Sequence, residues 1–169
     1  MISSSAGGQV CFWDTRQFAQ PTLAVEGIFS LADAQMQTIS CVRVSPCRTR
    51  AAFLTTAGYC IVQNLSRWTN AQHEAQGGHV VALNPLNRLH MENECKLDWS
   101  PCGRFIACGS NAADKCIHII DMALGDVSLK FLGHSSAVID VAWIRNGTGL
   151  MSTSCDGFIR SWCPTMPHI

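Results

Sequence analysis

The sequence has little charge. Asp, Glu, Lys and Arg make up 14% of its 169 residues, and the two signs balance at twelve each, without a run of like charges. Such a chain has no electrostatic reason to bind nucleic acid or a membrane surface strongly and without specificity. Contact with a ribonucleoprotein stays compatible with this neutrality, because neighbouring proteins can supply the basic surface.

The N-terminal residues also lack the basic and apolar regions of a secretory signal peptide, and no apolar run approaches the roughly 20 residues that cross a bilayer. The Gly7-Gly8 pair lacks the surroundings of a phosphate-binding loop. We therefore expect a soluble, intracellular chain that holds no cofactor. Its length is enough for one domain with a sizeable core.

Ten cysteines are present, but no two have the CxxC spacing of common zinc sites. Most lie inside apolar, strand-like runs: Cys41, Cys60, Cys95, Cys108 and Cys116. In a reducing compartment a free cysteine behaves as a small buried hydrophobic residue. We therefore predict reduced, metal-free core thiols rather than a disulfide framework or a zinc site.

The C-terminal part carries an ordered series of turn and strand signals. A Gly-His pair at 133–134 precedes an apolar run at 137–143, and a Ser-rich segment with an Asp-Gly turn at 152–157 precedes a strand that ends at Trp162. This series is typical of one blade of a β-propeller. Because a blade cannot bury its apolar faces alone, the series predicts neighbouring blades.

Three earlier copies of the final strand are present. One ends at Trp13-Asp14, a degenerate one at Gln63-Asn64, and a third at Ile120-Asp121, where isoleucine stands in place of tryptophan. The interval between the last two copies fits a blade of about 40–45 residues, and the earlier intervals require loop insertions.

A second signal agrees with these copies. Ser45-Pro46-Cys47 and Ser100-Pro101-Cys102 each follow a short apolar run. Proline cannot continue a central ladder, so both triplets predict the exit from the first strand of a blade.

These signals predict an all-β chain of about fourteen strands, or three and a half four-stranded blades, in a single partial β-propeller. The repeats fall at residues 1–31, 32–88, 89–132 and 133–163, the first and last of them incomplete. Closed propellers have about four to eight blades, and raw sheet edges template aggregation. We therefore expect the C-terminal half of a larger ring, completed by a missing N-terminal segment or a second chain.

The chain resembles WD-repeat proteins over nearly its whole length, most specifically at residues 133–162. Within that family it is similar to the small WD-repeat subunit of the spliceosomal U5 snRNP, at residues 13–17, 84–93, 97–110 and 132–134. The resemblance implies a seven-bladed, nuclear propeller that docks on the large central scaffold protein of the spliceosome. The chain departs from that subtype in its missing first half, its degenerate second repeat and the isoleucine at position 120.

The resemblance also places four residues at the positions of the family's structural tetrad: His134, Ser152, Asp156 and Trp162. A buried carboxylate needs donors, and a connected network of this kind rigidifies one blade. A catalytic triad made of the same serine, histidine and aspartate is the alternative. The spacing is that of a fold motif and no nucleophile elbow accompanies it, so we predict no catalytic residue.

The third repeat keeps two tetrad positions, His90 and Asp114, and its network is expected to be weaker because Ile120 replaces tryptophan. His118 alternates with apolar neighbours and is expected to face solvent or the next blade, without partners at metal-ligand spacing. Trp68 lies in a polar loop, where it is either a local anchor or a contact to a partner, since tryptophan is enriched in interface hot spots.

The predicted function is that of a non-catalytic interaction subunit of a large protein assembly, the U5 snRNP in the first place. A WD-repeat adaptor of another complex, with a cytoplasmic location, is the alternative: histone-modifying, RNA 3′-end-processing, ubiquitin-ligase or axonemal. The third class, an enzyme, lacks a converging set of catalytic side chains in the sequence.

Overall fold

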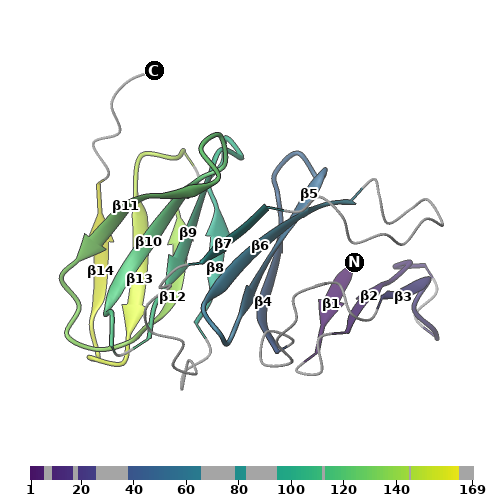
Figure 1. The fold of residues 1–169 in the computed structure, drawn as a ribbon, viewed down its shortest axis with the longest axis horizontal. Helices are drawn as coiled ribbons and strands as arrows, with labels where there is room; N and C mark the ends of the chain where they lie inside the picture. The colour runs from purple at the N-terminus through teal and green to yellow at the C-terminus, as the bar shows by residue number, and fades with distance from the viewer. Residues whose placement is uncertain are drawn as a thin grey trace.

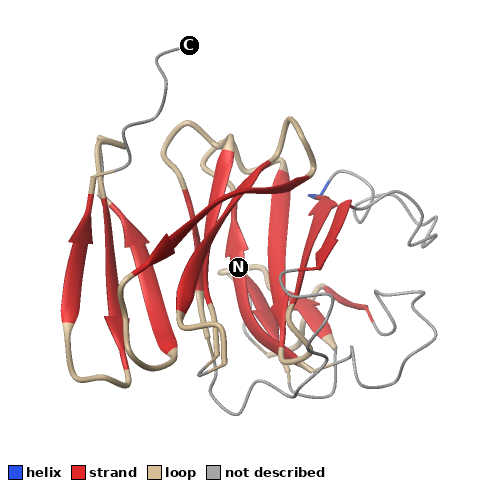
Figure 2. Cartoon of the chain, turned by 60° about the vertical axis from the view of Figure 1, so that its left-hand side comes forward, coloured by secondary structure: helices blue, strands red, loops and turns tan. Residues whose placement is uncertain are grey.

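The computed structural model describes residues 1–5, 9–16, 19–25, 38–65, 79–82, 95–111, 113–144 and 146–163. These residues form fourteen strands, and every strand pairing between them is antiparallel (Figure 1). Figure 2 shows that strands and their connecting loops make up nearly all of the described chain. In this part of the chain, no helix is long and apolar enough to cross a membrane.

The strands assemble into four sheets, with three strands in the first and last and four in the two between them. In chain order the strands are β1 (Ile2–Ser4), β2 (Val10–Phe12), β3 (Leu23–Val25), β4 (Ile39–Val44), β5 (Arg50–Thr55), β6 (Tyr59–Asn64), β7 (His79–Ala82), β8 (Leu97–Trp99), β9 (Phe105–Gly109), β10 (Cys116–Asp121), β11 (Asp126–Leu132), β12 (Val138–Trp143), β13 (Leu150–Ser154) and β14 (Ile159–Trp162). Within each sheet the strands follow chain order, as in a meander. The predicted all-β fold of about three and a half blades is confirmed.

Successive sheets pack side by side through their first strands. Strand β1 contacts β4, β4 contacts β8, and β8 contacts β12. The sheet β1–β3 lies at one end of the molecule in Figure 1 and the sheet β12–β14 at the other. Sheets that follow one another in this way, each with its first strand beside the next, form an open, partial β-propeller.

The core consists of three apolar layers, one between each pair of neighbouring sheets. Phe53 and Ile61 are fully buried between the first and second sheets, and Leu54 and Ile106 between the second and third. Ile117, Ile119 and Leu150 fill the layer between the third and fourth sheets. Strands β5 and β10 contribute to two layers at once, and both of their faces are buried.

The first hairpin turns of the second, third and fourth sheets have the same geometry. The amides of Arg48, Gly103 and Gly147 each donate to the carbonyl three residues earlier, at 2.7–2.8 Å. Their φ angles are 59°, 71° and 76°, in the left-handed region. Glycine accepts this region readily, whereas Arg48 adopts it against its Cβ.

The third and fourth sheets are joined by backbone hydrogen bonds as well as by apolar packing. The Val138 amide donates to the Ser110 carbonyl at 2.8 Å, and the Lys96 amide to the Ile139 carbonyl at 3.0 Å. Gly109 lies at this junction, and a Cβ there would overlap the backbone carbonyl of Val138. The absence of a side chain at position 109 therefore allows the two sheets to approach.

All ten cysteines are free thiols, and the five predicted inside strands are buried. Four of them, Cys41, Cys60, Cys95 and Cys108, belong to the apolar layer between the second and third sheets. Burial raises the pKa of Cys95 to about 12. The Cys95 thiol therefore stays protonated, and all four side chains pack as small apolar groups.

Candidate functional site: polar networks within the blades

The fourth sheet contains a connected hydrogen-bond network. His134 Nδ1 lies 2.8 Å from Asp156 Oδ2, and His134 Nε2 lies 2.8 Å from Ser152 Oγ. The indole Nε1 of Trp162 donates to the same Ser152 oxygen at 2.7 Å. The structure thus brings together all four residues of the predicted tetrad, from the segment before β12, from β13, from the β13–β14 turn and from β14.

The donors of this network assign its protons. An indole N–H can only donate, so Ser152 Oγ accepts from Trp162 and directs its own hydrogen to His134 Nε2. The Nε2 atom is then the acceptor of the ring, and Nδ1–H donates to Asp156. Every polar side-chain atom along this path has a partner.

Asp156 is the anionic end of the network. Burial alone would raise the pKa of its carboxyl, but hydrogen bonds from the Ser135 amide, the His134 ring and the Phe158 amide hold that pKa well below its usual value. The carboxylate therefore stays charged and fastens the turn between β13 and β14 to the segment that precedes β12.

The Ser-His-Asp order of contacts is that of a catalytic triad, yet the surroundings of the serine differ from those of a nucleophile. Ser152 is 1% exposed. Its oxygen already accepts the Trp162 indole hydrogen, and Phe131 stacks on that indole with the ring centroids 5.5 Å apart. A substrate carbonyl has no approach to a hydroxyl enclosed in this way.

A shorter version of the network lies in the first sheet. Trp13 Nε1 donates to Ser3 Oγ at 2.8 Å. Trp13 occupies the same register relative to Ser3 as Trp162 does relative to Ser152, since the Trp13 amide bonds opposite Met1 and Trp162 pairs with Leu150. Sequence reasoning selected Trp13 but missed Ser3. The sequence does contain a signal for Ser3. In both sheets a serine follows, by two residues, the residue that lies opposite the tryptophan.

Two aspartates, one just after β2 and one at the end of β10, pair with arginines. Asp14 and Arg16 form an exposed ion pair at 2.7 Å, and the hydrogen bond from Arg16 lowers the pKa of Asp14. Arg104 reaches both carboxylate oxygens of Asp121 at 3.2 and 2.9 Å, and it lowers the pKa of Asp121 in the same way. The Arg104–Asp121 pair links the residue before β9 to the end of β10, whereas the Asp14–Arg16 pair is local and exposed.

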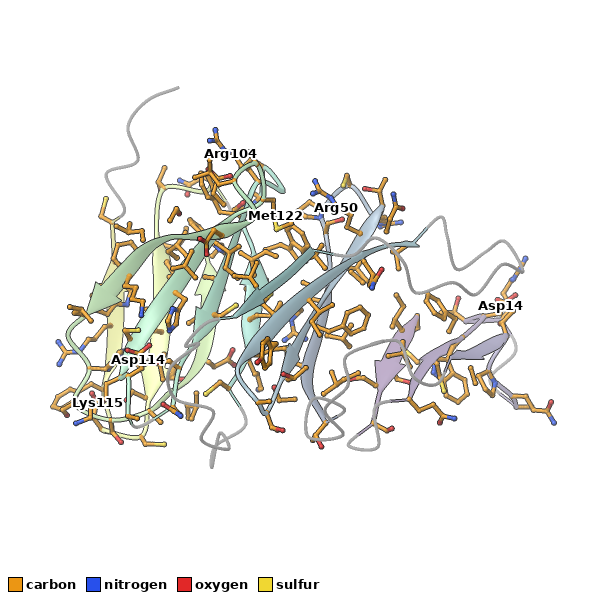
Figure 3. The ribbon with its side chains drawn as sticks, viewed as in Figure 1. Asp14, Arg50, Arg104, Asp114, Lys115 and Met122 are labelled. Carbon is orange, nitrogen blue, oxygen red and sulfur yellow. The ribbon has the colours of Figure 1, made fainter. Side chains whose placement is uncertain are left out.

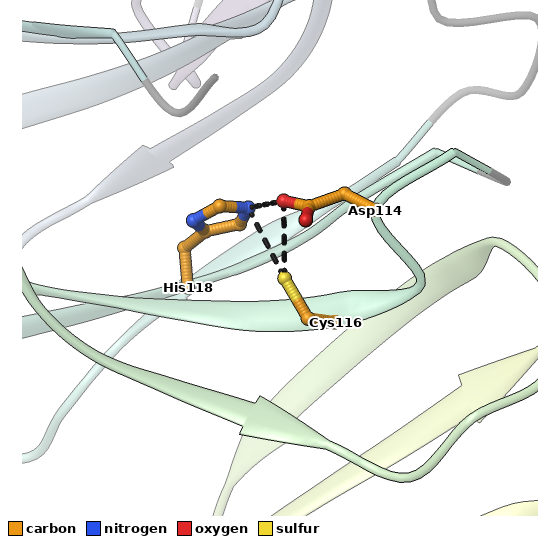
Figure 4. Close-up of side chains that lie close together, drawn as sticks. All are labelled: Asp114, Cys116 and His118. Atoms are coloured by element: carbon orange, nitrogen blue, oxygen red, sulfur yellow. Dashed lines mark hydrogen bonds and ion pairs between the residues drawn. The ribbon is translucent and has the colours of Figure 1, made fainter.

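A second polar cluster lies at the opposite end of β10 from Arg104, as Figure 3 shows for Asp114. Asp114 contacts His118 Nε2 at 2.7 Å and the Cys116 thiol at 3.2 Å (Figure 4). It also lies 3.5 Å from Lys130 Nζ. His118 and Cys116 are 3.3 Å apart. The predicted tetrad partner of Asp114, His90, lies outside the described residues, so the pairing of these two residues stays a prediction.

The sequence predicted that His118 faces either solvent or the next blade, and the structure contradicts the first of these. The side chain is fully buried, so a solvent-facing His118 is wrong. It pairs across the sheet with Cys108 and so shares the face that packs on the second sheet. Burial lowers the pKa of His118 and raises the pKa of Cys116 to about 12.

Trp68, the predicted partner contact, also lies outside the described residues. Among the described ones, large apolar side chains are exposed at the β13–β14 hairpin: Met151 by 45%, Phe158 by 61% and Ile159 by 68%. Met151 and Ile159 lie on the face of the sheet opposite to buried Leu150 and Ser152.

Four antiparallel sheets in chain order, with inter-sheet apolar layers and tryptophan-linked polar networks, define a partial β-propeller. Residues 90–121 and 125–163 match the WD domain, G-beta repeat family. The chain therefore contains two WD40 repeats, a type of repeat that generally serves non-catalytic protein-interaction scaffolds. The second repeat runs from β11 to β14, so it begins on the outer strand of one sheet and ends within the next.

Proposed function

We propose that this chain is a non-catalytic, nuclear interaction subunit of the spliceosomal U5 snRNP that docks on the large central scaffold protein. The proposal is supported by the position of the resemblance to that subtype. Its strongest stretches, residues 97–110 and 132–134, fall within the two WD40 repeats. They form β8, β9 and the approach to His134.

One structural observation supports docking on a protein: the exposed apolar face of the fourth sheet. Met151 and Ile159 lie on it, beside the exposed Phe158 of the turn. Neighbouring described residues on that face are small or polar, such as Ala142 and Ser161. An apolar centre with a small polar rim suits a protein partner, and the guanidinium of Arg160, 5.6 Å from the Phe158 ring centroid, lies at its edge.

The enclosed Ser152 supports a scaffold over a hydrolase. If the Ser-His-Asp set were catalytic, an activity-based phosphonate probe would label Ser152. We expect no labelling of the purified chain and no hydrolysis of ester substrates.

Affinity purification of the tagged chain from nuclear extract tests the assembly. We expect U5 snRNA and the central scaffold protein to be recovered. Recovery of chromatin modifiers, 3′-end-processing factors, ubiquitin-ligase subunits or tubulin would replace the splicing assignment by the alternative adaptor function.

A surface variant tests the docking face itself. Ile159→Glu places a charge on that face and should abolish recovery of the partner. Leu124→Glu is the matched control, because Leu124 is 72% exposed but lies in the β10–β11 turn. Equal recovery with both variants would show that the partner binds elsewhere.

A further inference from the structure

Three potential metal ligands alternate at the start of β10. Asp114 precedes the strand, Cys116 is its first residue and His118 its third. Cys116 and His118 are two residues apart in the strand, so their side chains point to the same side. The turn before the strand, in which Lys115 has a φ of 53°, brings the Asp114 carboxylate to them. Figure 4 shows the three groups converging, with Asp114 on the loop side of the other two.

The spacing of the ligand atoms is close to that of a tetrahedral zinc site. Asp114 Oδ2, Cys116 Sγ and His118 Nε2 are separated by 2.7, 3.2 and 3.3 Å. With metal–ligand bonds of about 2.0–2.3 Å, tetrahedral ligand atoms lie about 3.3–3.6 Å apart. The two contacts of Cys116 come near this range, and binding an ion requires the Asp114 carboxylate and the His118 ring to move apart.

The polar contacts of the histidine ring all lie on the side of the other two groups. His118 Nδ1 is buried and has no hydrogen-bond partner in the described structure. Nε2 alone makes the polar contacts of the ring, to Asp114 and Cys116.

The donor set selects the kind of ion. One thiolate sulfur, one imidazole nitrogen and one carboxylate oxygen match Zn²⁺, whereas Mg²⁺ and Ca²⁺ prefer oxygen ligands alone. Cys116 and His118 are buried, while the Asp114 side chain is 20% exposed. The ion would enter from the Asp114 side, where water can complete the coordination.

The fourth sheet provides an internal comparison. Ile120 and Trp162 hold equivalent positions two residues beyond His118 and Arg160, respectively. At the positions of Cys116 and His118 the fourth sheet has Phe158 and Arg160, both exposed. The blade fold therefore does not demand a thiol or an imidazole at these positions.

We propose that Asp114, Cys116 and His118 form a zinc-binding site with three protein ligands. This revises the prediction that all the cysteines are metal-free, for Cys116 alone. Lys130 is the competitor of the ion, because its ammonium group lies 3.5 Å from the same Asp114 oxygen. It is 43% exposed and able to turn away into solvent.

Cobalt substitution of the chelator-treated full chain tests the site. Co²⁺ should bind with one-to-one stoichiometry and give a thiolate-to-cobalt charge-transfer band, and Zn²⁺ should displace it. Cys116→Ser should remove this band. Asp114→Asn should weaken Zn²⁺ binding at least about tenfold, the lower end of what losing even an outer partner of a ligand costs.

Two further variants keep the proposal falsifiable. Cys102→Ser, at an exposed cysteine outside the cluster, should leave the band and the affinity unchanged. Lys130→Gln should strengthen binding, because it removes the competing charge. Absence of the band in the folded wild-type chain, or its persistence in Cys116→Ser, would overturn the site and leave the cluster as a hydrogen-bond network only.

Discussion

Ser152 shows how one small side chain organises a blade. It accepts a hydrogen bond from Trp162 and donates one to His134, so it links the third strand of the sheet to the segment before the first. Ser3 makes the corresponding contact to Trp13 in the first sheet. Where the tryptophan is replaced, as at Ile120, apolar packing takes over that position.

Replacing Ser152 by alanine should destabilise the folded chain. The change leaves the Trp162 donor and the His134 acceptor without their partner in a buried place, at a cost of about 1–3 kcal/mol for each unsatisfied group. Urea denaturation measures the difference in the free energy of unfolding. Ser161→Ala, at an exposed position of β14, is the control. If the two variants were equally stable, the network would not stabilise the blade.

The charge on Asp156 makes stability depend on pH. Its folded-state pKa is depressed, so its contribution is complete above the pKa of an unfolded aspartate, about 4, and is lost as the pH falls below that value. We expect the unfolding temperature of the wild-type chain to fall on acidification below about pH 4.

The variant Asp156→Asn should be less stable at neutral pH and should show a flatter dependence in that acidic range. Asp126→Asn, on the exposed side of β11, should keep the wild-type profile. A variant of Asp156 with unchanged stability but no partner binding would instead identify this residue as a contact.

At the level of strands and turns, the repeated sequence signals account for much of the fold. Apolar runs between Pro and Gly turns predicted the strands, and the Ser-Pro-Cys triplets do end β4 and β8. The side of the sheet taken by His118 was harder to predict. Successive side chains of a strand point to opposite faces of the sheet. In a blade that is stacked on both sides, both of these faces are buried, so a polar residue in the strand need not face water.

The turns after β4 and β8 allow a matched comparison. Gly103→Ala should lower the free energy of unfolding by about 1 kcal/mol. Alanine makes the unfolded chain less flexible, which favours folding, but the strain of a Cβ in the left-handed conformation is larger than this gain. The new Cβ would meet only Pro46 at 3.8 Å, so no clash adds to this cost. Arg48→Ala should be nearly neutral, because both residues carry a Cβ in the same conformation. Thermal unfolding distinguishes the two, and equal losses would contradict this explanation.

On the scale of the whole molecule, the open propeller depends on how closely its sheets approach one another. Sequence repeats identify the blades but carry no sign of which positions meet across them. The Ser110–Val138 hydrogen bond and the space at Gly109 become visible only once two blades are stacked. The register of β12 against the third sheet is set by these contacts together with the apolar layer around Ile117 and Leu150.

Gly109→Ala should therefore loosen the joint between the third and fourth sheets. Its added methyl group would overlap the Val138 carbonyl, and relieving that overlap requires a backbone shift that costs about 1–3 kcal/mol, more than Gly103→Ala. Hydrogen exchange locates the effect, because the Val138 amide donates to Ser110 across the joint and should exchange faster, while amides in β5 and β6 should not change. Uniformly faster exchange in all four sheets would mean that the blades unfold as one cooperative unit, and an unchanged Val138 amide would show that the sheets do not meet at Gly109.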